Sequence, residues 1–309
     1  MPFPLLTVEQ ACEALASVGI RVSTAALHVE PRDERWVVRL PPGRLAWFAV
    51  SREGRARLAT ERRVLRVLEA RCRFRAPRVL HEGADGDFDV RAMLPGETDP
   101  FRLFDATARD PALAARIGAA IGALLANQHL HVPAADVADW LPGRPRWPAL
   151  SDELRAQLPL VVDDAALLDR IDAVLSAYDA VTVADRDRVL VHADVGFHNL
   201  GVDPESLVVH GIFDYDGAAF ADRHHDFRYL VFLRDDEPLL EGALAVYEPA
   251  VGLPISRDRV TLYNAACAVA FLAHRAGTRP NERPCGRTLD EDLGWTRAAV
   301  TRALVAVRT

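Results

Sequence analysis

The chain has 309 residues, of which 50% are hydrophobic and 26% are charged; this length suits two domains, and this composition excludes a disordered or a membrane-embedded protein. Its 37 basic and 44 acidic residues give a formal net charge of −7, which argues against nucleic acid and anionic membranes as partners. All of the basic residues are arginine, because the sequence contains no lysine. The four cysteines form no CxxC pair and no stretch is long and apolar enough for a membrane span, so we expect a cytoplasmic protein.

The first hundred residues have the pattern of a strand-rich unit with one helix. Alternating apolar residues bounded by turn-forming residues predict five strands, at 25–30, 35–40, 44–50, 78–81 and 88–93. Within residues 55–70, apolar residues such as Leu58, Leu65 and Leu68 recur at helical spacing. We therefore expect an antiparallel meander with this helix lying across it, and a domain boundary near Pro95-Gly96.

Beyond residue 100 the apolar spacing becomes helical. It predicts three helices, at 110–129, 165–177 and 257–275, the first of them capped by Asp110. Between the last two helices, strand-like runs at 189–191 and 208–213 flank a polar loop. The sequence therefore predicts an α+β protein with a small antiparallel-sheet domain at residues 1–95 and a mainly helical domain at residues 96–309.

The polar loop has a residue spacing that is typical of phosphoryl transfer. His192, Asp194 and Asn199 reproduce the H-x-D-x-x-x-x-N pattern of the protein-kinase catalytic loop, in which the aspartate receives the hydroxyl proton and the asparagine holds magnesium. Asp214 follows the second strand, where a buried carboxylate needs a cation or catalytic work. We predict Asp194 as the catalytic residue and Asn199 and Asp214 as Mg²⁺ ligands.

These motifs together resemble the aminoglycoside phosphotransferase family. The matching segments are His192-Ala193-Asp194 with Asn199, Ile212-Phe213-Asp214, Ala221-Asp222-Arg223 with Asp226, and the hinge-like Met93-Leu94-Pro95-Gly96-Glu97. Glu61, inside the predicted helix at 55–70, resembles the family's helix-C glutamate. The resemblance implies a bilobal protein-kinase-like fold and ATP or GTP at the hinge. It also implies transfer to a hydroxyl of a small molecule, such as an aminoglycoside or another antibiotic.

Three departures from the family pattern affect the nucleotide site. Ala193 replaces a glycine, the N-terminal strands carry no glycine-rich phosphate loop, and no lysine is present to pair with Glu61. Arginine binds phosphate in a bidentate manner and also pairs with glutamate, so Arg39 and Arg44 are the candidates to replace the lysine. We predict Arg39, Arg44, Glu61 and Met93 as nucleotide-binding residues.

Two other functions fit the same residues. A kinase-derived module that binds ligand but transfers nothing would account for the missing lysine and glycine loop. A metal-dependent hydrolase would use His192, Asp194, Asp214 and nearby histidines. Magnesium-dependent binding and consumption of nucleotide distinguish the three functions. The sequence leaves open the acceptor, the choice between ATP and GTP, and the oligomeric state.

Overall fold

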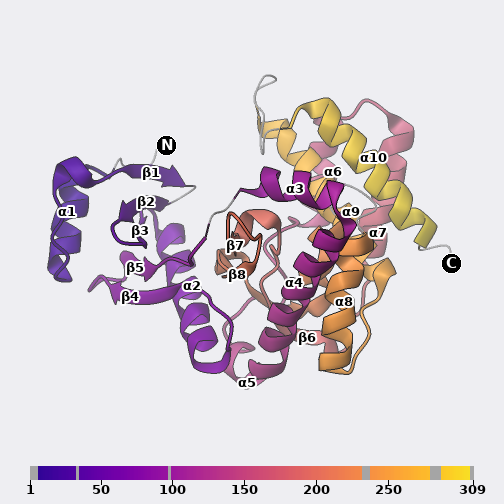
Figure 1. The fold of residues 1–309 in the computed structure, drawn as a ribbon. Coiled ribbons are helices and arrows are strands. Elements are labelled where there is room, and N and C mark those ends of the chain that lie inside the picture. Colours follow the sequence, from indigo (N-terminus) through magenta and orange to yellow (C-terminus); the bar gives the residue numbers. More distant parts are fainter. Residues whose placement is uncertain (1–5, 33–34, 97–98, 232–236, 279–286, 307–309) are drawn as a thin grey trace.

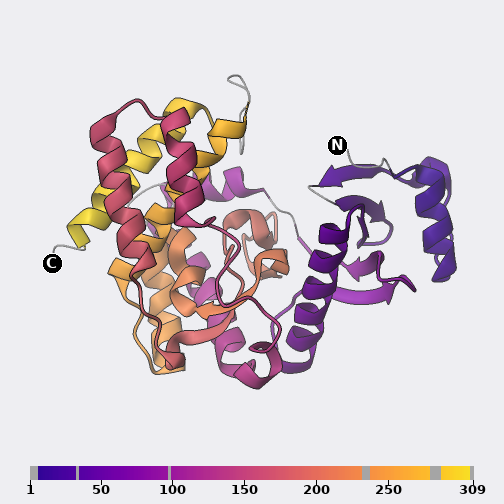
Figure 2. The same cartoon turned by 180° about the vertical axis from the view of Figure 1, so that it is seen from behind.

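A computed structural model describes residues 6–32, 35–96, 99–231, 237–278 and 287–306. Figures 1 and 2 show two parts, a smaller one built around a sheet and a larger one built mainly of helices. We call them the sheet part (residues 6–96) and the helical part (residues 99–306). The hinge-like segment from Met93 to Gly96 leads from one to the other, and Glu97, the last residue of that motif, lies outside the described residues. The predicted α+β class is confirmed.

The sheet part contains a five-stranded antiparallel sheet in the order β1-β2-β3-β5-β4. Its strands are β1 (Val29–Arg32), β2 (Arg35–Leu40), β3 (Arg44–Ala49), β4 (Arg78–Glu82) and β5 (Phe88–Ala92). One face carries Val38, Phe48 and Val90, which form an apolar core with helix α1 (Val8–Ser17). Helix α2 (Arg52–Arg71) lies on the side that faces the helical part, as both views show (Figures 1 and 2).

The sheet part differs from the sequence prediction at two places. The segment at 25–30 begins as a 3₁₀ turn, Thr24–Ala26, and β1 continues through Pro31, which an edge strand tolerates because its outward side needs no N–H donor. Helix α1 was not predicted. Its signal is nonetheless local, since Thr7 and Gln10 form a capping box at its start.

The helical part is built on a closely packed helix pair. Its helices are α3 (Pro100–Arg109), α4 (Pro111–His131), α5 (Ala134–Val137), α6 (Ser151–Gln157), α7 (Ala165–Asp179), α8 (Glu237–Val251), α9 (Arg257–His274) and α10 (Leu289–Ala306). Asp110 caps α4 as predicted. At Gly118 and Gly122 a Cβ atom would collide with backbone oxygens of α8, so glycine allows α4 and α8 to pack backbone against backbone. None of the described helices is long and apolar enough to span a membrane.

Two short antiparallel strand pairs in the helical part carry the polar loop found in the sequence. Strand β6 (Arg188–Val191) pairs with β9 (Ala219–Asp222), and β7 (Leu200–Val202) pairs with β8 (Val209–Ile212). The predicted strands at 189–191 and 208–213 are thus present as β6 and β8. The loop from β6 to β7 and the residues after β8 are consequently held side by side over the core of the helical part.

Candidate active site

The structure brings four predicted site residues into one place between the two parts. Asp194 and Asn199 lie on the loop between β6 and β7, Asp214 follows β8, and Glu61 lies in the middle of α2. Burial, together with the nearby carboxylates of Glu61, Asp216 and Asp194, raises the pKa of Asp214 to about 7. The site therefore carries more negative charge than its surroundings neutralise, which favours a bound cation.

Asp194 is held in a defined orientation at the surface of the loop. Its Oδ2 atom accepts a hydrogen bond from Asn199 Nδ2 at 2.9 Å, and His198 Nε2 lies 3.1 Å from the same oxygen. Partial burial acts to raise the pKa of Asp194, but the hydrogen bond and charge of His198 hold this pKa below its ordinary value. The side chain is 38% exposed, so an ionised carboxylate is available to an incoming hydroxyl group.

Asn199 is oriented so that its amide oxygen points away from Asp194. Its Nδ2 group donates to both the backbone oxygen and the carboxylate of Asp194, each at 2.9 Å, while within the described ranges its Oδ1 atom has no hydrogen-bond donor. Together with Asp214 it offers two oxygen ligands, which fits Mg²⁺, an ion that usually takes one or two protein ligands plus waters and substrate phosphates. Among the described residues no three His, Cys, Asp or Glu side chains are grouped to hold a metal.

Buried polar groups beneath the loop hold its backbone. His192 Nε2 donates to the Phe213 carbonyl oxygen at 2.8 Å, and His192 Nδ1 accepts from Asp194 N at 3.2 Å. Burial lowers the pKa of His192, so the ring stays neutral and can donate at one nitrogen and accept at the other. His192 therefore ties the loop of Asp194 to the residue that precedes Asp214.

Ala193 adopts a backbone conformation that favours glycine. Its φ angle is 67°, in the left-handed region. Asp226 accepts from the backbone N–H groups of His192 and Ala193 at 3.1 and 2.7 Å, and Arg228 donates to the Ala193 carbonyl oxygen. These contacts impose the conformation despite the Cβ atom, so the alanine at this glycine position carries local strain.

We expect Ala193→Gly to stabilise the protein by up to about 1 kcal/mol and to leave turnover nearly unchanged, because relief of the left-handed strain exceeds the entropy that glycine loses. Thermal unfolding of the two proteins measures the effect. Ala219→Gly in strand β9 is the matched control, since Ala219 is buried and does not have a positive φ angle. Equal destabilisation by both substitutions would contradict the strain argument.

The predicted pairing of Arg39 or Arg44 with Glu61 is wrong. Arg39 is 67% exposed and its Nε atom lies 3.5 Å from Glu30 Oε1, while Arg44 donates to the Pro41 carbonyl oxygen at 2.6 Å. Strand geometry explains both positions. Arg39 lies four residues beyond Arg35 on β2, a distance of about 13 Å along the strand. Side chains of a strand alternate between the two faces of the sheet, so Arg44 lies on the same face as Ala46 and Phe48 of β3. This is the face that packs on α1.

Arg35 and Arg91 are the arginines that contact Glu61. Arg91 Nη1 lies 2.7 Å from Glu61 Oε1, and Arg35 Nη1 lies 3.4 Å from Glu61 Oε2, with all three side chains at most 4% exposed. Arg91 is also bound by Asp89 through two hydrogen bonds, at 2.7 and 3.0 Å. The Trp47 ring lies between them on the same face of the sheet, with its centroid 4.7 Å from Arg35 Cζ and 5.6 Å from Arg91 Cζ.

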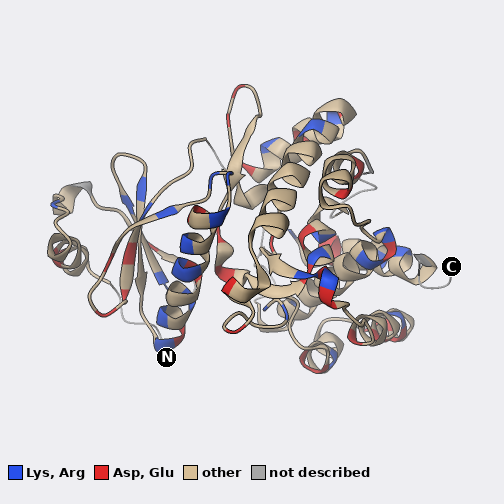
Figure 3. Cartoon of the chain, turned by 90° about the horizontal axis from the view of Figure 1, so that it is seen from below, with Lys and Arg blue, Asp and Glu red and all other residues tan. Residues whose placement is uncertain are grey.

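Arg35 also connects the sheet part to the loop that follows Asp214. Its Nη2 atom donates to Asp216 Oδ2 at 3.2 Å, and Arg57 of α2 binds the same carboxylate through Nε and Nη2. Burial acts to raise the pKa of Asp216, but the hydrogen bond from Arg57 and the charge of Arg35 hold it below its ordinary value. Basic residues recur along the whole of α2 (Figure 3). Sequence patterns did not single out Arg35, Arg57 or Arg91.

Met93 lies at the end of β5, where the chain leaves the sheet. Its side chain is 37% exposed, and its backbone N–H donates to the Gly43 carbonyl oxygen at 2.8 Å. Three residues later, Gly96 has a φ angle of 105°, and a Cβ atom there would lie 2.5 Å from the Val202 carbonyl oxygen. Glycine is thus required at position 96, where the chain passes close to the backbone of Val202. The contact of Met93 with nucleotide stays a prediction.

A catalytic loop of this spacing, placed under a sheet and a glutamate-bearing helix, defines a kinase-like phosphotransferase. The chain belongs to the phosphotransferase enzyme family, whose model matches residues 16–263. The resemblance seen in the sequence is confirmed, and the family favours an enzyme over an inert binding module. No curated protein matches the chain.

Solved structures with the same fold are distant in sequence. The GDP complex of wild-type aminoglycoside 2'-phosphotransferase-IIIa has 15% identity and a TM-score of 0.70, covering 96% of this chain and 98% of that one. Macrolide 2'-phosphotransferase MphH from Brachybacterium faecium has 17% identity and a TM-score of 0.64, covering 96% and 98%. The streptomycin–ATP complex of APH(2")-IIa has 12% identity and a TM-score of 0.62, covering 99% and 97%. At these identities they show the fold.

Proposed function

We propose that this chain transfers a phosphoryl group from ATP or GTP to a hydroxyl of a small molecule, with Mg²⁺ as cofactor. The observation that carries this proposal is the grouping of Asp194, Asn199 and Asp214 beside Glu61, which two arginines hold in place. In this scheme residues 1–95 cover the nucleotide, and residues 96–309 supply the catalytic loop and the acceptor site.

Each residue of the site has a part that follows from its contacts. Asp194, the exposed member, orients the acceptor hydroxyl and receives its proton. Asn199 Oδ1 and the Asp214 carboxylate would hold Mg²⁺, which neutralises charge on the phosphates when it is bound. Catalysis in this scheme consists mainly of positioning and electrostatic stabilisation, as phosphoryl transfer requires.

Arg35 is the cation best suited to take the place of the missing lysine. Arg91 has short contacts to both Asp89 and Glu61, whereas the ion pairs of Arg35 are 3.2 and 3.4 Å long, and among the residues described its buried Nε atom has no hydrogen-bond partner. A guanidinium group with unused donors, located between the sheet and the loop after Asp214, can bind a phosphate oxygen without losing a strong contact.

We expect Arg35→Met to raise the nucleotide dissociation constant by about tenfold or more, because a charge-assisted contact to phosphate is lost. Glu61 keeps Arg91 and Asp216 keeps Arg57, so the fold should survive. Calorimetric titration with magnesium nucleotide measures the change. Arg39→Met removes an exposed arginine from the same strand and should change the constant by less than about twofold. Equal effects of the two variants would reject the role of Arg35.

The neighbouring structures suggest the first acceptors and donors to test, since they include complexes with kanamycin, gentamicin, streptomycin, GDP and ATP and a macrolide 2'-phosphotransferase. The test is consumption of ATP and of GTP with Mg²⁺ across a panel of hydroxylated small molecules that includes aminoglycosides and macrolides. Phosphorylated product that depends on nucleotide supports the proposal. Nucleotide binding without transfer to any acceptor would favour the inert module, and acceptor hydrolysis without nucleotide would favour the hydrolase.

A further inference from the structure

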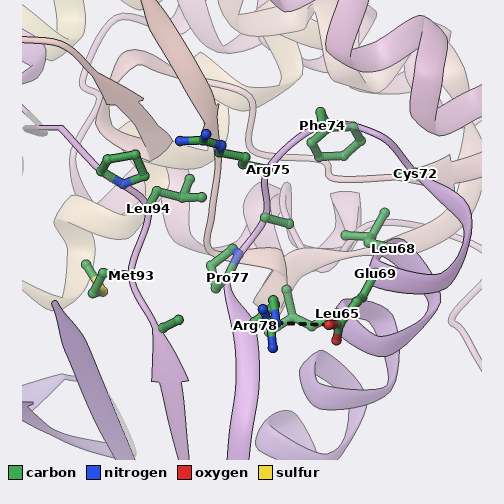
Figure 4. A pocket seen from close by; sticks show the side chains of 13 residues that line it. Leu65, Leu68, Glu69, Cys72, Phe74, Arg75, Pro77, Arg78, Met93 and Leu94 are labelled. Carbon is green, nitrogen blue, oxygen red and sulfur yellow. Dashed lines mark ion pairs between the residues drawn. The ribbon is translucent and has the colours of Figure 1, made fainter.

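A cavity lies away from the catalytic loop, between the end of α2 and the end of β5. Its volume is about 330 Å³, within the range of small-molecule sites. Its walls are mostly apolar, formed by Leu65, Leu68, Phe74, Ala76, Pro77, Ala92, Met93, Leu94 and Pro95. Figure 4 shows these side chains on two sides, with α2 and the segment 72–78 facing the chain that leaves β5. Of the predicted site residues, the cavity includes only Met93.

Two arginines lie at the edges of this cavity, and only one of them has an acidic partner among the residues described. At one edge Arg78 Nε lies 2.9 Å from Glu69 Oε1, so these two charges cancel (Figure 4). Arg75 lies at the opposite edge (Figure 4); it is an exposed residue whose guanidinium has no acidic or hydrogen-bonding partner among the residues described. Burial raises the pKa of the Cys72 thiol to about 11, so this group stays uncharged. The cavity thus offers apolar walls and one unpaired positive charge.

We propose that this cavity binds a small amphipathic anion, with an apolar body against the leucine, phenylalanine and methionine side chains and a carboxylate at Arg75. Apolar walls favour a ligand that removes apolar surface from water, and an unpaired guanidinium favours a carboxylate at one end of that ligand. A cationic ligand of the same shape would meet Arg75 with like charge and is disfavoured.

Two walls of the cavity belong to elements that also carry residues of the candidate active site. Leu65 is one helical turn after Glu61 on α2, and Arg91 directly precedes Ala92 on β5. The Arg75 carbonyl oxygen accepts from Ile212 N at 3.4 Å, two residues before Asp214. A ligand in the cavity therefore contacts α2 and the end of β5, which carry Glu61 and Arg91, and the segment 72–78, which is hydrogen-bonded to β8. Through these elements the bound ligand alters the affinity of the active site for nucleotide. This part of the inference rests on the proposed function.

The test of binding uses octanoate as the probe and the full chain. Calorimetry should show saturable binding of one octanoate with a dissociation constant of about 1 mM or below. Arg75→Gln should weaken it by about fivefold or more, whereas Arg73→Gln, an exposed arginine outside the cavity, should change it by less than about twofold. Octylammonium should bind far more weakly. Equal binding of octylammonium, or equal losses in the two variants, would overturn the proposal.

A chemical readout locates the bound probe independently. Cys72 lines the cavity, whereas Cys12 lies in α1, and both are half-buried free thiols. Saturating octanoate should slow alkylation of Cys72, followed by mass spectrometry, and leave Cys12 unaffected. Binding heat without protection of Cys72 would place octanoate elsewhere and refute the site.

The regulatory effect has its own measurement. At saturating octanoate the dissociation constant for magnesium nucleotide should shift by about twofold or more in the wild type and remain constant in Arg75→Gln. An unchanged constant in the wild type would overturn the regulatory part while leaving the binding site intact. If no nucleotide binds at all, the proposed function fails, and the octanoate titration still decides the cavity.

Discussion

Asp194→Asn is expected to lower the rate of phosphoryl transfer by about 10²- to 10⁴-fold, the usual loss when a positioned general base is removed. The substitution keeps the size of the side chain, and the amide can still accept from Asn199 Nδ2. It removes only the group that receives the proton of the acceptor hydroxyl. Nucleotide affinity and thermal stability should therefore stay close to those of the wild type.

Steady-state turnover of the purified variant, with the acceptor found in the panel, measures this loss. Asp185→Asn makes the same chemical change at an exposed aspartate away from the loop and should leave turnover unaffected. Wild-type turnover in Asp194→Asn would remove this residue from the catalytic step. A parallel loss of nucleotide affinity would instead assign it to the nucleotide site.

Asp214→Asn is expected to weaken binding of magnesium nucleotide by about tenfold or more, because a carboxylate that would share the metal contributes to binding as well as to turnover. The fold should not suffer. Burial and three neighbouring carboxylates raise the pKa of Asp214 to about 7. The raised pKa means that the ionised carboxylate destabilises the metal-free protein above that pH, so a neutral side chain relieves this cost. Asparagine also tolerates the φ angle of 67° at this position better than alanine does.

Two measurements separate this prediction from general damage to the protein. Calorimetric titration with magnesium nucleotide should place Asp214→Asn far below Asp194→Asn in affinity, although both substitutions change one aspartate to asparagine. Thermal unfolding without metal at pH 8 should show Asp214→Asn to be at least as stable as the wild type. Equal nucleotide affinities would reject the division of roles, and a large loss of stability would reject the charge argument.

Local patterns were sufficient for much of the fold. The strands at 35–40 and 44–50, the helix around Glu61 and the helix capped by Asp110 all arise from the spacing of apolar residues and from capping within one segment. The boundaries were less accurate because neighbouring strands decide where pairing stops. Strand β1 shows this, since its pairing with β2 extends through Pro31 and Arg32, beyond the end of the strand predicted at 25–30.

The catalytic loop is what the sequence by itself determined about the site. His192, Asp194 and Asn199 lie within eight consecutive positions, so their relative placement follows from one short loop. The arginine that pairs with Glu61 was decided only by the tertiary structure. Arg35 is 26 residues from Glu61 and 181 from Asp216 along the chain, and it meets them through the register of β2 and the packing of α2 against the helical part. The sheet part contains many arginines, so composition does not show which of them contacts Glu61. Strand register and the alternation of side chains between the two faces determine which arginine points at this glutamate.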